Sequence, residues 1–74
     1  MLTSADIKSR ADAVTVDPFS GIVDVPGTSR SFRLEYEGGE WVVFDLDWTR
    51  RISAPRLDVA KAACHKMATE FTLY

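Results

Sequence analysis

The sequence predicts a small α+β domain, in which an antiparallel sheet of about three strands carries a long C-terminal helix on one face, with a short N-terminal helix before the sheet. Three observations lead to this fold class. Residues 31–37 alternate strictly between polar and apolar side chains, which is the period of a half-buried strand. The pair Gly38-Gly39 that follows is typical of a turn between two strands. Apolar side chains then recur every three or four residues from Leu57 to Phe71, as in an amphipathic helix.

The length and composition indicate one folded domain over residues 1–74. A chain of this size buries only about 60% of the surface that its unfolded form exposes, which leaves little room for a deep catalytic cleft. Its apolar content of 46% and charged content of 27% are those of a globular protein. The single cysteine, Cys64, cannot form an internal disulfide, which favours a cytoplasmic location. No apolar run approaches the roughly 20 residues of a membrane span, so we expect neither membrane insertion nor export.

The first part of the chain predicts one helix and one strand. Ile7, Ala11 and Val14 are spaced by four and three residues, with Thr3 or Ser4 as the N-cap of the helix. Residues 17–21 contain the proline and glycine of a turn. The β-branched side chains that follow predict a short strand over residues 22–25. The last helix is expected to begin near residues 53–55, where a serine can cap it and a proline fits its first turn.

The loop length of the predicted hairpin decides which side chains share a face of the sheet. A two-residue loop at Gly38-Gly39 would place Phe32 opposite Asp45, so that a carboxylate faces a core side chain. A three-residue loop over residues 37–39, with Gly39 left-handed as the bulge residue, avoids this arrangement. We therefore predict the three-residue loop, which gathers these apolar side chains on one face: Phe32, Leu34, Tyr36, Val42, Phe44 and Leu46.

The opposite face of the hairpin is then the candidate binding surface. It is acidic, and Trp41 lies in its middle, a residue type that is enriched among those that dominate binding energy. If the first helix or the strand over residues 22–25 covers this face, Trp41 is buried instead. The candidate partner-binding residues are Glu35, Glu37, Glu40, Trp41, Val43, Asp45 and Asp47.

The sequence offers few groups for catalysis. Cys64 and His65 are the only thiol and imidazole, and adjacent residues on a helix point about 100° apart, which disfavours a nucleophile and base pair. They also fall short of the four ligands of a structural zinc site. Asp45 and Asp47 share a strand face, but a catalytic carboxylate pair needs a cleft. We expect no enzyme activity, no cofactor and no metal site.

The distribution of charge leads to the functional hypotheses. Residues 31–47 have a net charge of −4, from five acidic side chains and one basic, whereas residues 48–66 have +4, from five basic and one acidic. The leading hypothesis is a non-catalytic protein-binding module that engages the basic surface of a protein or nucleoprotein complex. A homodimer formed through an open sheet edge is a further possibility. The alternative function is a small nucleic-acid-binding domain that contacts phosphates through Arg50, Arg51, Arg56 and Lys61.

Two resemblances bear on the partner. The helical run over residues 57–63, after strands that carry Trp41, looks somewhat like the arm-type DNA-binding domain of phage integrases, which implies DNA binding, although those domains use basic and polar side chains on the sheet. The small size, the lack of a catalytic motif and the carboxylate cluster resemble small phage-borne inhibitor proteins of the anti-CRISPR type. That resemblance implies an inhibitor in the host cytoplasm, whose carboxylates meet lysines and arginines of a nucleic-acid-processing partner. The cluster consists of Glu35, Glu37, Glu40, Asp45 and Asp47.

Overall fold

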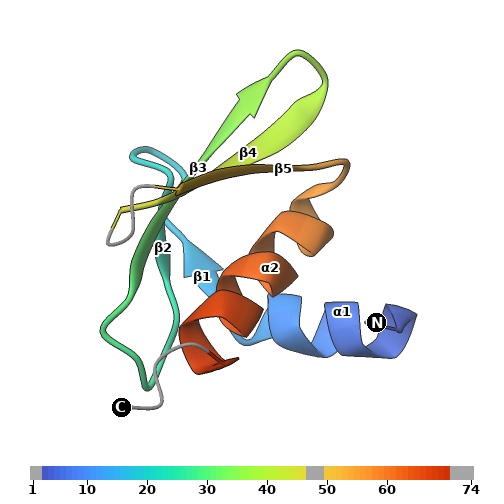
Figure 1. Cartoon of the computed structure of the whole chain (residues 1–74), viewed down its shortest axis with the longest axis vertical. Helices are drawn as coiled ribbons and strands as arrows, with labels where there is room; N and C mark the ends of the chain where they lie inside the picture. Colours follow the sequence, from blue (N-terminus) through green and yellow to red (C-terminus); the bar gives the residue numbers. More distant parts are fainter. Residues whose placement is uncertain (1–2, 47–49, 71–74) are drawn as a thin grey trace.

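The computed structural model describes residues 3–46 and 50–70 and confirms the α+β class (Figure 1). Within these residues, five strands form an antiparallel sheet in the order β1-β2-β3-β4-β5. The prediction of about three strands is therefore too low, because β1 and β5 were not expected. The elements are α1 (Ser4–Asp12), β1 (Thr15–Val16), β2 (Ile22–Asp24), β3 (Ser31–Glu37), β4 (Glu40–Asp45), β5 (Arg50–Ala54) and α2 (Leu57–Glu70).

The two additional strands carry weak sequence signals. β1 has only two residues, and β5 includes a single large apolar side chain, Ile52, so neither shows a clear alternation. Ser53, the expected helix cap, lies in β5, and α2 begins after Pro55, at Leu57. Strand pairing with β4 thus decides the structure of this segment, and the predicted start of the helix was too early.

The hairpin between β3 and β4 is closed by a two-residue turn, so the predicted three-residue loop is wrong. Leu34 lies opposite Val43, and Phe32 lies opposite Asp45. Gly38 and Gly39 have φ angles of 55° and 84°, and positive φ at both central residues is what a type I′ hairpin turn requires. Because side chains alternate along a strand, this difference of one residue exchanges the two faces of β4.

The two-residue turn is possible because Arg30 pairs with Asp45 inside the protein. The prediction of a three-residue loop did not include this contact. Arg30 and Asp45 are only 8% and 2% exposed, and they form an ion pair. The guanidinium carbon of Arg30 also lies 5.3 Å from the centre of the Phe32 ring. A buried carboxylate opposite a core phenylalanine is therefore paired, and the objection to the two-residue loop does not hold.

Both helices lie on one side of the sheet (Figure 1). α2 packs on β4 and β5, and α1 packs against α2. Of the predicted apolar stripe of α2, Ala60, Cys64 and Met67 are buried, Leu57 is 40% exposed, and Phe71 lies outside the described residues. The largest fully buried side chains of the core are Phe32, Val25, Val43 and Cys64.

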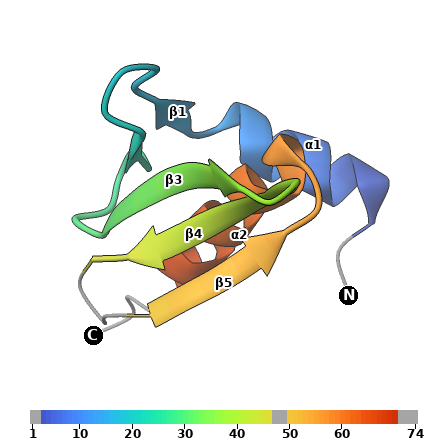
Figure 2. The same cartoon turned by 90° about the horizontal axis from the view of Figure 1, so that it is seen from above.

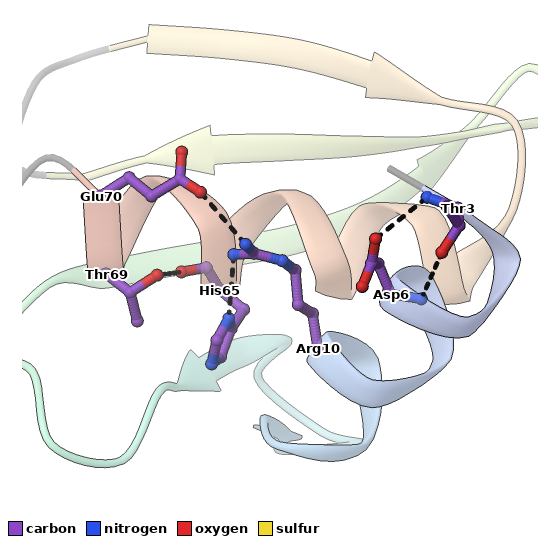
Figure 3. A network of polar contacts seen from close by, with 6 residues as sticks. All are labelled: Thr3, Asp6, Arg10, His65, Thr69 and Glu70. Carbon is purple, nitrogen blue, oxygen red and sulfur yellow. Dashed lines mark hydrogen bonds and ion pairs between the residues drawn. The ribbon is translucent and has the colours of Figure 1, made fainter. Parts of the chain in front are cut away.

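The N-terminal helix is held by the cap that the sequence predicts. The Thr3 hydroxyl accepts a hydrogen bond from the backbone N–H of Asp6, and the Asp6 carboxylate accepts one from the backbone N–H of Thr3 (Figure 3). This reciprocal arrangement is a capping box. At the other end of the helix, Arg10 reaches α2, where it forms a 3.1 Å ion pair with Glu70.

Candidate functional site

The predicted acidic face does not form as expected. Val43 and Asp45 are 1% and 2% exposed, so neither can contact a partner. Trp41 is half-buried on the helix side, where it packs against the core, and its ring lies 5.1 Å from that of Tyr36 in an edge-to-face arrangement. These three residues were expected on the binding surface, and the one-residue change in register places them on the opposite side of the sheet.

Of the other four predicted site residues, the three that the structure describes are at least partly exposed. Glu37 and Glu40 are exposed and lie opposite each other next to the hairpin turn. Glu35 is half-buried on the face of β3 that points away from the helices. Asp47 lies outside the described residues.

The outward face of the sheet is the surface that the corrected register creates. Figure 2 shows β3, β4 and β5 in front of α2, with neither helix over them. We call this surface the open face, and the strand pairing assigns to it Ile22, Arg33, Glu35, Glu37, Glu40, Val42, Phe44, Arg51 and Ser53. Val42 is nevertheless buried among its neighbours on this face. Four residues of the open face form a direct cross-strand row in the order Ile22, Arg33, Phe44 and Arg51.

Phe44 lies between two guanidinium groups in the middle of this row. The guanidinium carbons of Arg33 and Arg51 are 5.3 Å and 5.6 Å from the centre of its ring, within the range of cation–π contacts. Arg33 also forms a 2.7 Å ion pair with Glu35, and Arg51 a 3.3 Å ion pair with Glu37. Each arginine is thus held by an aromatic ring and by a carboxylate, which reduces the side-chain entropy that binding would cost.

Hollows flank this row on both sides. One, of about 500 Å³, lies between Arg33, Glu35 and the turn that joins β1 to β2. The other, of about 210 Å³, is lined by Phe44, Leu46 and Arg51, together with Asp45 and Arg50. Leu46 and Ile22 are 50% and 42% exposed. The open face therefore combines apolar groups, charges of both signs and shallow relief.

The four basic residues of the nucleic-acid hypothesis do not form one patch. Arg51 lies on the open face, whereas Arg50, its neighbour in β5, points to the other side and donates to the Met67 sulfur at 3.2 Å. Arg56 pairs with Asp58 at 3.2 Å just before α2. Lys61 lies within α2 and lines a separate hollow on the helix side of the sheet.

The thiol and the imidazole have structural environments. Burial, and then the nearby Asp45 carboxylate, raise the pKa of Cys64 to about 12. The ring of His65 accepts at Nδ1 from Arg10 at 3.4 Å, since a guanidinium can only donate (Figure 3). In residues 3–46 and 50–70, no three His, Cys, Asp or Glu side chains cluster as metal ligands would.

Of the residues in the cross-strand row, Phe44 was expected in the core, Arg51 was expected only as a phosphate contact, and Arg33 was not a candidate site residue. Their alternation with buried neighbours is visible in the sequence, but the assumed hairpin register assigned Phe44 to the core.

In the part of the chain that the structure describes, neither helix is long and apolar enough to span a membrane. No protein-family model, curated protein or solved structure matches this chain.

Proposed function

We propose that this chain is a non-catalytic protein-binding module that contacts its partner through the open face of the sheet. The observation that carries the proposal is the row in which Phe44 lies between Arg33 and Arg51 on a face that neither helix covers. Aromatic and arginine side chains at the centre of a patch, with charged groups at its rim, are typical of protein interfaces.

The ion pairs of the open face favour a protein over a nucleic acid as the partner. Both arginines of the row are already neutralised by carboxylates, Glu35 and Glu37. A phosphate would have to displace these carboxylates and approach their negative charge. A protein surface can instead supply apolar contacts to Phe44 together with charges of either sign.

The hairpin tip indicates the chemistry of that partner. Glu37 and Glu40 are opposite each other across the strand pair, and like charges in this position repel. Arg51 compensates Glu37 at 3.3 Å, while Glu40 adds a second negative charge beside it. A lysine or arginine of the partner would relieve this repulsion. Such a basic surface is typical of proteins that bind nucleic acid, and a module that covered it would act as an inhibitor.

Charge reversal at the hairpin tip tests the proposal. A tagged chain is used to capture partners from an extract of the native host, and the affinity for the captured partner is then measured by titration calorimetry. The double variant Glu37→Lys with Glu40→Lys should bind at least about tenfold more weakly, because two exposed carboxylates that face basic groups are reversed.

The matched control carries the same charge change on the helix side of the molecule. Asp12→Lys with Asp58→Lys reverses two carboxylates whose side chains are 66% and 47% exposed. This control should bind as the wild type does. Equal losses in both double variants, or no loss in either, would contradict the proposal. A salt-sensitive gel shift with nucleic acid that persists in the Arg33→Glu variant would favour the alternative function, a small nucleic-acid-binding domain.

A further inference from the structure

A third hollow extends to the helix side of the sheet, and it shares Pro18, Gly21 and Leu34 with the hollow beside Arg33. It has a volume of about 370 Å³ and opens between the sheet, the first turns of α2 and the turn that joins β1 to β2. We call it the Trp41 groove, and its lining consists of Val16, Asp17, Pro18, Gly21, Leu34, Trp41, Leu57 and Lys61.

The walls of the groove suit an apolar ligand. Leu34 and Trp41 contribute from the sheet, and Leu57, which is 40% exposed, contributes from the start of α2. Val16 and Pro18 close the side formed by the β1–β2 turn. A volume of about 370 Å³ is within the range of small-molecule sites, at its lower end. A ring or branched alkyl group with a short chain would fill it.

Lys61 brings a positive charge to the groove. It follows Leu57 by one helical turn and is half-buried. Among the described residues it forms no salt bridge, whereas six other basic side chains do. A lysine can bury its alkyl stem along apolar side chains while its ammonium group stays free to meet a ligand, so an anion in the groove can pair with Lys61 without displacing a carboxylate of the described residues.

Asp17, the one carboxylate among the lining residues, is already engaged by its own turn. Its Oδ1 accepts the backbone N–H of Phe19 at 2.9 Å. Hydrogen bonds from Phe19 and Ser20 lower the pKa of Asp17, so it stays ionised while it holds the turn. Its charge therefore serves the local backbone, and it forms no ion pair with Lys61 within 4 Å.

We infer that the Trp41 groove binds a small carboxylic acid with an aromatic or branched aliphatic body. The body packs on Leu34, Trp41 and Leu57, and the carboxylate meets the ammonium group of Lys61. Trp41, Leu57 and Lys61 line this groove but not the hollow beside Arg33, and neither Glu37 nor Glu40 of the hairpin tip lines it. Variants at Lys61 and at the hairpin tip therefore test the two proposals separately.

The test uses 3-phenylpropionate and its uncharged analogue 3-phenylpropanamide as probes. Trp41 fluorescence reports binding in a Trp48→Phe background, which leaves a single tryptophan. The acid should quench or shift this emission saturably and bind at least about threefold more tightly than the amide. The Lys61→Met variant should bind both probes equally, because only the charged contact is removed.

Lys66→Met is the matched control, since Lys66 is also half-buried in α2 but does not line the groove. It should retain the preference for the acid. Asp17→Asn should strengthen binding of the acid, because a neutral side chain can accept the same turn hydrogen bonds without repelling the ligand. Circular dichroism confirms that each variant is folded. No saturable binding, equal affinities for acid and amide in the parent chain, or equal effects of the two lysine variants would overturn the inference.

Discussion

Asp45 shows how one side chain can have opposite interpretations in the sequence and in the structure. In the sequence it belongs to an acidic cluster, and its reversal to lysine would be expected to affect binding alone. In the structure it is 2% exposed and paired with Arg30 beside the core. A lysine at this position would place two cations together in the interior, so such a variant tests the fold and not the binding surface.

Removal of the carboxylate should therefore destabilise the protein strongly. We expect Asp45→Ala to lower the free energy of unfolding by about 3–5 kcal/mol, because it leaves the Arg30 charge buried without its counterion. Urea unfolding followed by circular dichroism measures this loss. The control Glu40→Ala removes an exposed carboxylate from the same strand and should change stability by about 0.5 kcal/mol or less.

The double variant Arg30→Met with Asp45→Leu separates the pair from the packing around it. Replacement of both partners by apolar side chains should recover most of the loss, since no unpaired charge remains. If Asp45→Ala were as mild as Glu40→Ala, the buried pair would not be a determinant of the fold.

Cys64 is the second residue whose environment gives a measurable consequence. Burial raises the pKa of this thiol from 9.0 to about 12 in the folded protein. Between these values the unfolded chain releases a proton that the folded protein retains, so the contribution to stability is complete below pH 9 and is lost as the pH rises towards 12.

The wild type should consequently lose more stability between pH 8 and pH 10.5 than the Cys64→Ala variant, in which other groups titrate alike. Parallel thermal melts at the two pH values give the difference. In the native protein at pH 8, the thiol should also react with a disulfide reagent far more slowly than in urea. Equal pH dependence of the two proteins would show that the thiol is not protected.

At the scale of elements, the hairpin turn has two glycines with different requirements. Gly38 has a φ of 55°, which asparagine adopts at little cost, whereas Gly39 has a φ of 84°, beyond the usual left-handed region. A Cβ atom at either position would meet no atom within 4 Å. The backbone conformation alone therefore decides the effect of a substitution.

Gly38→Asn should leave stability unchanged or raise it by about 0.5 kcal/mol, because Asn-Gly is the favoured pair in this turn and restricts the unfolded chain. Gly39→Ala should lower stability by about 1–2 kcal/mol. Chemical unfolding of the two variants provides the comparison. Equal destabilisation by both would indicate that the turn is not of type I′.

The elements differ in how far the sequence predicts them. β3 and most of α2 show strong periodicity, and the Thr3 cap is a local signal, so all three could be predicted. β1 and β5 depend on pairing with neighbouring strands, which two residues or a single large apolar side chain do not reveal. The hairpin register depends on Arg30, which lies in a loop and whose contact with Asp45 follows only from the fold.

At the scale of the whole molecule, the uneven charge along the chain is partly cancelled by pairing between segments. Arg51, from the basic segment, pairs with Glu37, from the acidic one. Arg30, which precedes the acidic segment, neutralises Asp45. Among the described residues of the acidic segment, Glu40 has no ion-pair partner within 4 Å, so the negative charge that remains lies at the hairpin tip, beside the Glu37–Arg51 pair.

The candidate site could be predicted only in part, because it too depends on pairing between segments that are distant in the sequence. The exposed position of Glu37 and Glu40 could be predicted, because both residues flank the Gly38-Gly39 turn in the sequence. The row of Arg33, Phe44 and Arg51 does not, because a cross-strand row exists only once the register is fixed. With both helices on one side, the chain separates the side chains that stabilise its core from those available on the open face (Figure 2).

The Arg30–Asp45 pair also limits the routes by which this sequence can change. The two residues are fifteen positions apart, and loss of either one alone strands a charge in the interior. A descendant with an apolar pair in their place could be equally stable, but it must be reached through a poorly folded intermediate. Single substitutions at these two positions are thus disfavoured, whereas many substitutions on the exposed surface are tolerated. The pair therefore acts as an epistatic barrier that preserves one strand register.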